Sequence, residues 1–223
     1  MESVKLPITK HWLFDFDGTL VDSMPYWSNA MISVLDSHGV KYGEDIIKII
    51  TPLGTAGTIK YFQSIGLNSP VSEIGKEISN RLTPLYLNEI GEKKGVRHCL
   101  EKMKEEGYHL HVLTASPHLW LDACLKRLGL WEIFENIWSS DDFGMGKSNP
   151  QIYVEAAKRI GVSIDEITFL DDNLNADKAA KESGIRVVGV FDLSSADSES
   201  EMRKIADGYI YDFTELEKAL CQT

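Results

Sequence analysis

Two aspartates one residue apart, Asp15 and Asp17, are the first residues of the chain with obvious chemical potential. They end an apolar run in HWLFDFDGTLVD (residues 11–22). Because successive apolar residues suit a strand covered on both faces, residues 12–16 predict a short buried strand. Alternate residues of a strand point to one side, so both carboxylates could face one spot before a sharp turn at Gly18. They could serve as nucleophile, general acid or metal ligand; two solvated acids in an Asp-Gly turn are the alternative.

Polar side chains also follow other expected strands. The run YHLHVLT (residues 108–114) ends in Thr114, and ITFLDD (residues 167–172) ends in Asp171 and Asp172. Lys147 lies between the expected strand NIWSS (residues 136–140) and the next helix. Each has an ordinary explanation taken alone: a helix cap, a turn, and a solvated loop lysine. Because ligands bind outside the carboxyl ends of the strands in an open parallel sheet, we expect these side chains to meet at one edge.

Segments with strand character alternate with helical segments, which predicts an α/β fold with a doubly wound, Rossmann-like parallel sheet. An all-helical block follows the first strand, so we expect a core domain of residues 1–22 and 93–223 and an inserted helical cap domain of residues 23–92. Pro84 should kink or divide the last cap helix, and SSADSESE (residues 194–201) should form a flexible polar loop. The expected strands are residues 12–16, 108–114, 136–140, 167–172, 186–190 and 208–211, and the expected helices are residues 25–39, 44–50, 58–65, 70–90, 96–107, 118–129, 150–160, 174–183 and 212–220.

Length and composition limit the class of protein. The 223 residues, 43% of them hydrophobic, are enough for one large domain or a domain with an insertion. A net charge of −11 argues against a nucleic-acid or anionic-membrane partner, because both need a basic surface. Three widely spaced cysteines indicate neither a disulfide framework nor a zinc site. Without an apolar leader or a long apolar run, we expect a cytoplasmic location.

The same residues resemble the haloacid dehalogenase-like hydrolase superfamily, whose first motif, hhhhDxDGTLhDS, is matched here by LFDFDGTLVDS. HVLTAS is similar to the second motif, GKSNPQIY to the third and TFLDDN to the fourth, in the family's order and over nearly the whole chain. Ser148 and Asn149 depart mildly from the third motif, GKPxPxIY. The helical insertion resembles the C1-type cap of the phosphoglycolate phosphatase and beta-phosphoglucomutase branch.

The resemblance implies catalytic roles that the chemistry explains. Asp15 would attack phosphorus and become an aspartyl-phosphate. Asp17 would protonate the departing alcohol and then activate the water that hydrolyses this intermediate. Thr114, the Ala115 amide and Lys147 would bind the phosphoryl oxygens, with Lys147 neutralising charge. The expected substrate is a small phosphorylated metabolite.

The resemblance also implies a magnesium cofactor, because an anionic nucleophile and a phosphate dianion repel each other. Asp15, Asp172 and the backbone carbonyl of Asp17 would hold Mg²⁺ in an all-oxygen site. Asp171 would either bind the metal through water or orient Asp172 and Lys147.

Three functions are weighed on these residues. Asp17 favours phosphatases and phosphomutases, because dehalogenases have no leaving alcohol to protonate. The beta-phosphoglucomutase branch has a histidine where this chain has Trp27, and its cap arginine would fall at Gly57 if Gly54 is the matching glycine; both differences favour a phosphatase. The third candidate, a non-catalytic phosphate-dependent regulatory or binding protein, would be expected to lose Asp15, Asp17 or Lys147.

The sequence leaves the substrate open. A sugar phosphate, a phosphoglycolate-like acid and a nucleotide all fit, and the oligomeric state is not indicated. Tyr26, Trp27, Lys60 and Arg81 are candidate substrate contacts from the cap, but aromatic residues at helical spacing more often belong to the core and lone basic residues are usually solvated, so none of the four is singled out. His118 follows the second motif and is read as a residue at the start of a helix.

Overall fold

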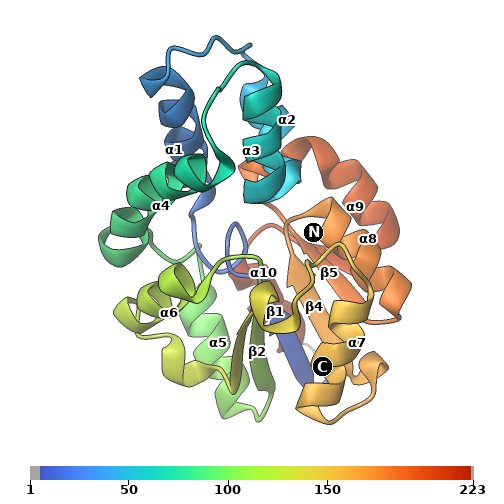
Figure 1. The fold of residues 1–223 in the computed structure, drawn as a ribbon. Coiled ribbons are helices and arrows are strands. Elements are labelled where there is room, and N and C mark those ends of the chain that lie inside the picture. The colour runs from blue at the N-terminus through green and yellow to red at the C-terminus, as the bar shows by residue number, and fades with distance from the viewer. Residues whose placement is uncertain (1–5, 222–223) are drawn as a thin grey trace.

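One parallel six-stranded sheet forms the centre of the protein (Figure 1). The computed structural model describes residues 6–221, and its strands lie in the order β3-β2-β1-β4-β5-β6, which confirms the predicted doubly wound α/β fold. The strand order reverses at β1, which pairs with β2 on one side and β4 on the other, so the ligand crevice is expected beyond its carboxyl end. The strands are β1 (His11–Phe14), β2 (His109–Thr114), β3 (Asn136–Ser139), β4 (Ile167–Asp171), β5 (Arg186–Val190) and β6 (Gly208–Ile210).

Alternate residues of β1 enter two different cores, one on each face of the sheet. Trp12 and Phe14 pack with α5 (Val96–Glu105), α6 (His118–Arg127) and α10 (Phe213–Leu220), whereas Leu13 packs with α7 (Gln151–Ile160) and α8 (Leu174–Ser183). Both faces of this strand are therefore buried, which explains its unbroken apolar run.

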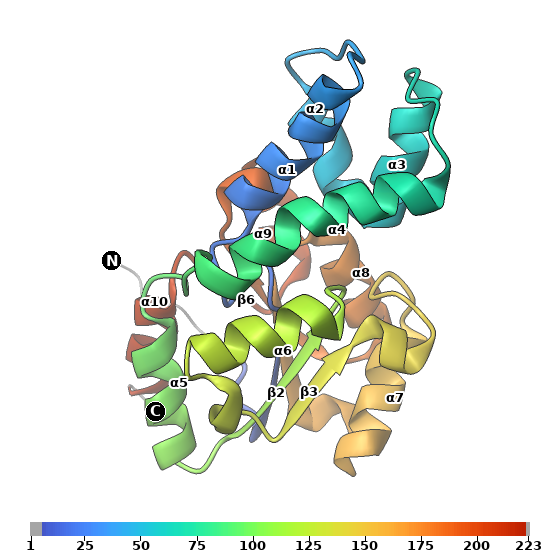
Figure 2. The ribbon, with the colours of Figure 1, turned by 60° about the vertical axis from the view of Figure 1, so that its left-hand side comes forward.

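Four helices fall between β1 and α5 in the sequence and gather beyond one end of the sheet (Figures 1 and 2). We call them the helical insertion. Its last helix packs against α1 within the insertion and against α6 below it. That helix runs unbroken through Pro84, so Pro84 does not divide it. The insertion comprises α1 (Met24–Ser37), α2 (Ile46–Ile50), the 3₁₀ turn η1 (Thr51–Leu53), α3 (Gly54–Ser64) and α4 (Val71–Asn88).

The prediction of a loop at residues 194–201 is wrong. This polar segment forms the 3₁₀ turn η5 (Leu193–Ser198) and the helix α9 (Glu199–Ile205). The Asp192 carboxylate accepts a hydrogen bond of 2.9 Å from the Ser194 amide and so caps the turn. Met202 is fully buried and anchors the helix, while its polar residues face outward.

The first strand ends two residues earlier than predicted. Beyond Phe14 the chain curls, because the amides of Leu20 and Val21 both donate to the carbonyl of Phe16, at 2.9 and 3.0 Å. Asp15 and Asp17 therefore lie just beyond the carboxyl end of β1 and directly before the turn at residues 18–20, instead of within the strand. Among residues 6–221, no helix is both long and apolar enough to span a bilayer.

Candidate active site

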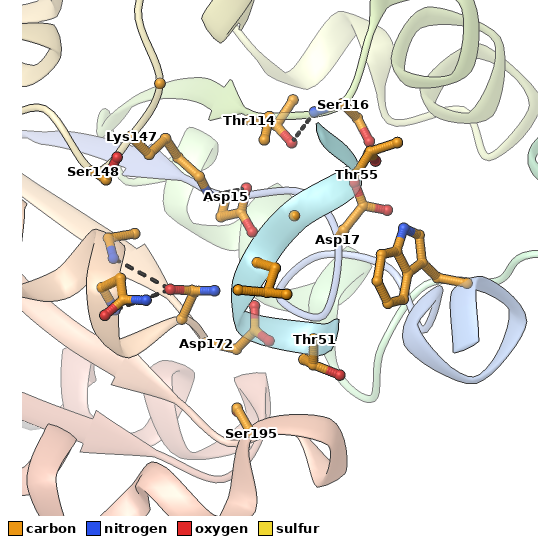
Figure 3. Close-up of a pocket in the computed structure, with 18 of the residues that line it drawn as sticks. Asp15, Asp17, Thr51, Thr55, Thr114, Ser116, Lys147, Ser148, Asp172 and Ser195 are labelled. Atoms are coloured by element: carbon orange, nitrogen blue, oxygen red, sulfur yellow. Dashed lines mark hydrogen bonds and ion pairs between the residues drawn. The ribbon is translucent and has the colours of Figure 1, made fainter. Parts of the chain in front are cut away.

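A cavity of about 980 Å³ lies where the carboxyl ends of the strands meet the helical insertion. Six of the seven predicted site residues line it, whereas Asp171 is not among its lining residues. Figure 3 shows Asp15, Asp17, Thr114, Lys147 and Asp172 around this cavity. The structure therefore brings together residues from three of the expected strand ends and from the loop before α7. Those six residues are Asp15, Asp17, Thr114, Ala115, Lys147 and Asp172.

Lys147 joins two buried carboxylates. Its Nζ lies 2.5 Å from Asp15 Oδ1 and 2.6 Å from Asp171 Oδ2, and its side chain is only 10% exposed. Burial alone would lower the pKa of Lys147, but the charges of Asp15 and Asp171 outweigh it and raise the pKa above its usual value. The ammonium group therefore stays charged beside Asp15, where an attacked phosphate would need a cation.

Three buried carboxylates could share one metal ion. Asp15, Asp171 and Asp172 offer oxygens that all lie within 4.8 Å of one another. Burial raises the pKa of Asp171 to about 7, even though Lys147 opposes this, and burial and the charge of Asp171 raise the pKa of Asp172. The single positive charge of Lys147 does not balance the negative charges of three carboxylates, which leaves room for a cation. Because all the donors are oxygens, the site suits Mg²⁺ or a similar hard cation. The residues present therefore fit the predicted cofactor class.

The Asp17 side chain is held apart from these three carboxylates by hydroxyl groups. Ser23 donates to its Oδ1 at 2.7 Å, Tyr86 donates to the same oxygen at 2.5 Å, and Ser116 donates to Oδ2. Burial and the charge of Asp15 raise the pKa of Asp17, and the three hydrogen bonds oppose that increase. Asp17 thus has a fixed orientation at the cavity wall, as a proton-transferring group needs.

The turn after the aspartates is fitted closely against Asp172. A Cβ atom on Gly18 would lie 2.5 Å from Asp172 Oδ2, and Gly18 has a φ of +76°. Only glycine fits both requirements. Lys93 fixes the same turn by donating to the Gly18 carbonyl at 2.6 Å and to Asp192 at 2.8 Å.

Some supporting residues were not predicted from the sequence. Tyr153 donates to the Lys147 carbonyl at 2.9 Å and steadies the lysine loop; its place in GKSNPQIY was the available signal. Tyr86 reaches Asp17 from α4, and no local pattern connects two residues so far apart. Asp177 is fully buried, with no hydrogen-bond partner for its carboxylate among the described residues. Burial, followed by the charge of Asp171, raises its pKa well above the usual value.

The other sequence candidates have different positions. Trp27 lines the cavity, whereas Tyr26, Lys60 and Arg81 do not; Arg81 instead pairs with Glu77 at 2.5 Å. His118 is the first residue of α6, as predicted. Its ring nitrogens lie 2.7 Å from Asp122 and 2.9 Å from Asp142, and these hydrogen bonds raise the pKa of His118.

Comparison with known proteins links this geometry to a family. The family model described as haloacid dehalogenase-like hydrolase matches residues 12–190. The chain is 28% identical to hexitol phosphatase B of Escherichia coli K12, over 80% of this chain and 82% of that protein. It is 27% identical to the phosphorylated carbohydrates phosphatase of Thermotoga maritima, over 80% and 83%. The crystal structure of CbbY from Rhodobacter sphaeroides in complex with phosphate superposes with a TM-score of 0.80 at 25% identity, over 94% and 96% of the two chains.

Proposed function

Because the chain belongs to the haloacid dehalogenase-like hydrolase family, we propose that it is a magnesium-dependent phosphatase that hydrolyses a small phosphorylated metabolite through an aspartyl-phosphate. One observation carries this proposal: the buried Asp15 carboxylate faces a cavity with Lys147 at 2.5 Å and Asp172 beside it. A nucleophile, a cation and a metal-binding carboxylate at one point are what attack on a phosphate dianion requires.

The reaction is written with this chain's own groups. Lys147, Thr114 and the Ala115 amide bind the phosphoryl oxygens. An Asp15 oxygen attacks phosphorus, the bond from phosphorus to the alcohol oxygen breaks, and protonated Asp17 gives its proton to that oxygen. Asp17 then takes a proton from water, whose oxygen attacks phosphorus and releases phosphate from Asp15. Both aspartates end as they began.

Asp15, Asp172 and the Asp17 carbonyl are the proposed magnesium ligands, and Asp171 would act through a bound water or by orienting its neighbours. The bound ion would neutralise charge shared by the carboxylates and the phosphate. The bond from Lys147 to Asp171 supports the orienting role, because it commits one oxygen of Asp171 to the lysine.

The site favours hydrolysis over the two alternatives. A phosphomutase remains the second candidate, yet Trp27 lines the cavity at the position of the mutase histidine, and the cap arginine would fall at Gly57 if Gly54 is the matching glycine. A binding protein without turnover would have no use for Asp17 held by three hydroxyl groups. The cavity retains Asp15, Asp17 and Lys147 together.

The proposal is tested by phosphate release from a panel of phosphorylated metabolites and from p-nitrophenyl phosphate, with and without magnesium. We expect release that depends on magnesium and is lost with a chelator. Interconversion of glucose 1-phosphate and glucose 6-phosphate without phosphate release would instead establish the mutase. If no ester reacts but phosphate still binds, the protein is a binding protein and the proposal fails.

Magnesium should also stabilise the fold, and more so at higher pH. Asp171 and Asp172 have raised pKa values when folded, so the folded protein binds more protons than the unfolded chain. The contribution of these two groups to the free energy of unfolding is complete at a pH below their ordinary pKa of 3.8. It is lost as the pH rises through the pKa that each group has in the folded protein, which is about 7 for Asp171. The metal-free protein should therefore lose stability between pH 5.5 and pH 8, where bound magnesium compensates.

We expect saturating magnesium to raise Tm by roughly 5–10 °C at pH 8, as for a ligand at about 100 times its Kd, and by less at pH 5.5. Scanning calorimetry with sodium chloride at matched ionic strength as the control measures the difference. An Asp172→Asn variant should lose most of the shift. Equal shifts in sodium and magnesium would contradict the proposed metal site.

A further inference from the structure

The part of the cavity wall built by the helical insertion carries no charge. Among the residues that the structure describes there, the insertion contributes aromatic, apolar and hydroxyl side chains, including Trp27, Thr51, Leu53, Thr55 and Tyr86. Figure 3 shows Thr51 and Thr55 on the η1–α3 segment that borders the catalytic aspartates. Since the phosphate would sit at Asp15 and Lys147, this uncharged wall faces the rest of the substrate.

Among the described residues that line the cavity, the lysines belong to its core side and not to the insertion. Lys48 of α2 lies 2.6 Å from Asp197, and Lys178, on the core side of the cavity, lies 2.5 Å from Glu201. Lys147 is held between two aspartates at the phosphate end. A second anionic group on the substrate, such as a carboxylate or another phosphate, would therefore meet no cation where it lies against the insertion's part of the wall. That is costly, so the wall selects against such substrates.

Hydrogen-bonding groups on the wall do remain open. The indole N–H of Trp27 and the hydroxyl of Thr55 have no hydrogen-bond partner among residues 6–221, and both residues line the cavity. The Asn175 carboxamide faces the same space from α8 and is likewise without a partner in the described chain. These donors and acceptors match the hydroxyl groups of a polyol.

The aromatic residues Trp27, Tyr86 and Trp120, which line the cavity, expose little of their surface. Trp27, Tyr86 and Trp120 are 9%, 1% and 7% exposed. The rings of Tyr86 and Trp120 stack on each other with centroids 5.2 Å apart and planes parallel. A nucleobase needs a broad exposed ring on which to stack, and these three residues do not provide one. The wall therefore suits a saturated leaving group over a nucleoside.

From these features we infer that the substrate is a phosphate monoester of a neutral, polyhydroxylated alcohol, a sugar or alditol, and that Trp27 and Thr55 determine this specificity by hydrogen bonding to its hydroxyl groups. This inference rests on the proposed phosphatase function. It adds the class of the leaving group and the two residues that recognise it.

The test compares kcat/KM for sorbitol 6-phosphate, glucose 6-phosphate, 2-phosphoglycolate, fructose 1,6-bisphosphate, AMP and p-nitrophenyl phosphate. We expect a neutral polyol ester to exceed the carboxylated, bisphosphorylated and nucleotide esters by about tenfold or more. Thr55→Val and Trp27→Phe each remove one donor and keep most of the volume. Each should lower kcat/KM for the best polyol ester by about tenfold more than for p-nitrophenyl phosphate, which has no hydroxyl to recognise.

Matched controls lie outside the cavity. Ser64→Ala removes a hydroxyl from the far end of α3, and Trp131→Phe removes an indole from the turn after α6. Neither variant should change the ratio of kcat/KM for the best polyol ester to kcat/KM for p-nitrophenyl phosphate. Binding to Asp15→Asn, followed as a Tm shift, gives a readout without turnover. There the polyol ester should stabilise the protein more than 2-phosphoglycolate does.

The outcomes separate the two claims. If p-nitrophenyl phosphate is hydrolysed but phosphoglycolate, the bisphosphate or AMP is preferred, the substrate class is wrong and the phosphatase stands. If Thr55→Val and Trp27→Phe slow all esters equally, the two residues do not recognise hydroxyl groups. If no ester is hydrolysed, the proposed function fails and this inference fails with it.

Discussion

Asp15→Asn is expected to reduce phosphate release by roughly 10⁴-fold or more, because the amide has no anionic oxygen to attack phosphorus. The change keeps the shape of the side chain and removes one of three clustered negative charges. The fold should therefore survive, and metal-free Tm should not fall. Phosphate release at saturating magnesium, together with Tm, measures both effects.

The matched control for this variant is Asp165→Asn. Asp165 is exposed in the turn η4 (Ile164–Glu166), directly before β4 and so at the opposite end of the sheet from the cavity. Its loss should change phosphate release by less than twofold. If Asp15→Asn retained near-normal turnover, the attack would come from water, and the aspartyl-phosphate route would be wrong.

The features that could be predicted from the sequence are those that depend on neighbouring residues, such as apolar runs and the alternation of strands with helices. The apolar run of β1 predicts a strand buried on both faces, and Trp12 and Leu13 do enter opposite cores. Once strands and helices alternate, the parallel sheet brings Thr114 and Asp172 to one edge without knowledge of any contact between them.

Features that depend on tertiary contacts were not predictable. The hydrogen bond from Tyr86 to Asp17 requires α4 to pack above the sheet, and no spacing rule links residues 69 positions apart. The η5–α9 segment was taken for a loop because it is polar, whereas the single buried residue Met202 holds it against the core. The polar composition of the segment reflects the exposed face of the helix and does not reveal that Met202 is buried.

Lys147→Met should produce the largest loss of stability of any substitution considered for this site. The change keeps the length of the side chain but leaves Asp15 and Asp171, 4% and 0% exposed, without their cation. Breaking a buried ion pair from one side costs about 3–5 kcal/mol. We expect that loss at pH 8 without magnesium, and a loss of about 10²–10³-fold in kcat, because one donor to the transferring phosphate is gone.

Lys158→Met is the matched control for Lys147→Met, because it removes the same charge from an ion pair that is exposed instead of buried. Lys158 also lies 2.7 Å from a carboxylate, that of Glu155, but its side chain is 63% exposed, so the same substitution should cost less than about 1 kcal/mol. Urea unfolding of both variants, with and without magnesium, tests the argument. Magnesium should reduce the difference in free energy of unfolding between Lys147→Met and the unchanged protein, since a divalent cation neutralises the same carboxylates. The kcat of Lys147→Met should stay low, because no cation then reaches the phosphate from the lysine side. If both substitutions lowered the free energy of unfolding equally, or if magnesium did not change the loss caused by Lys147→Met, then Lys147 would not balance the buried negative charge of this site.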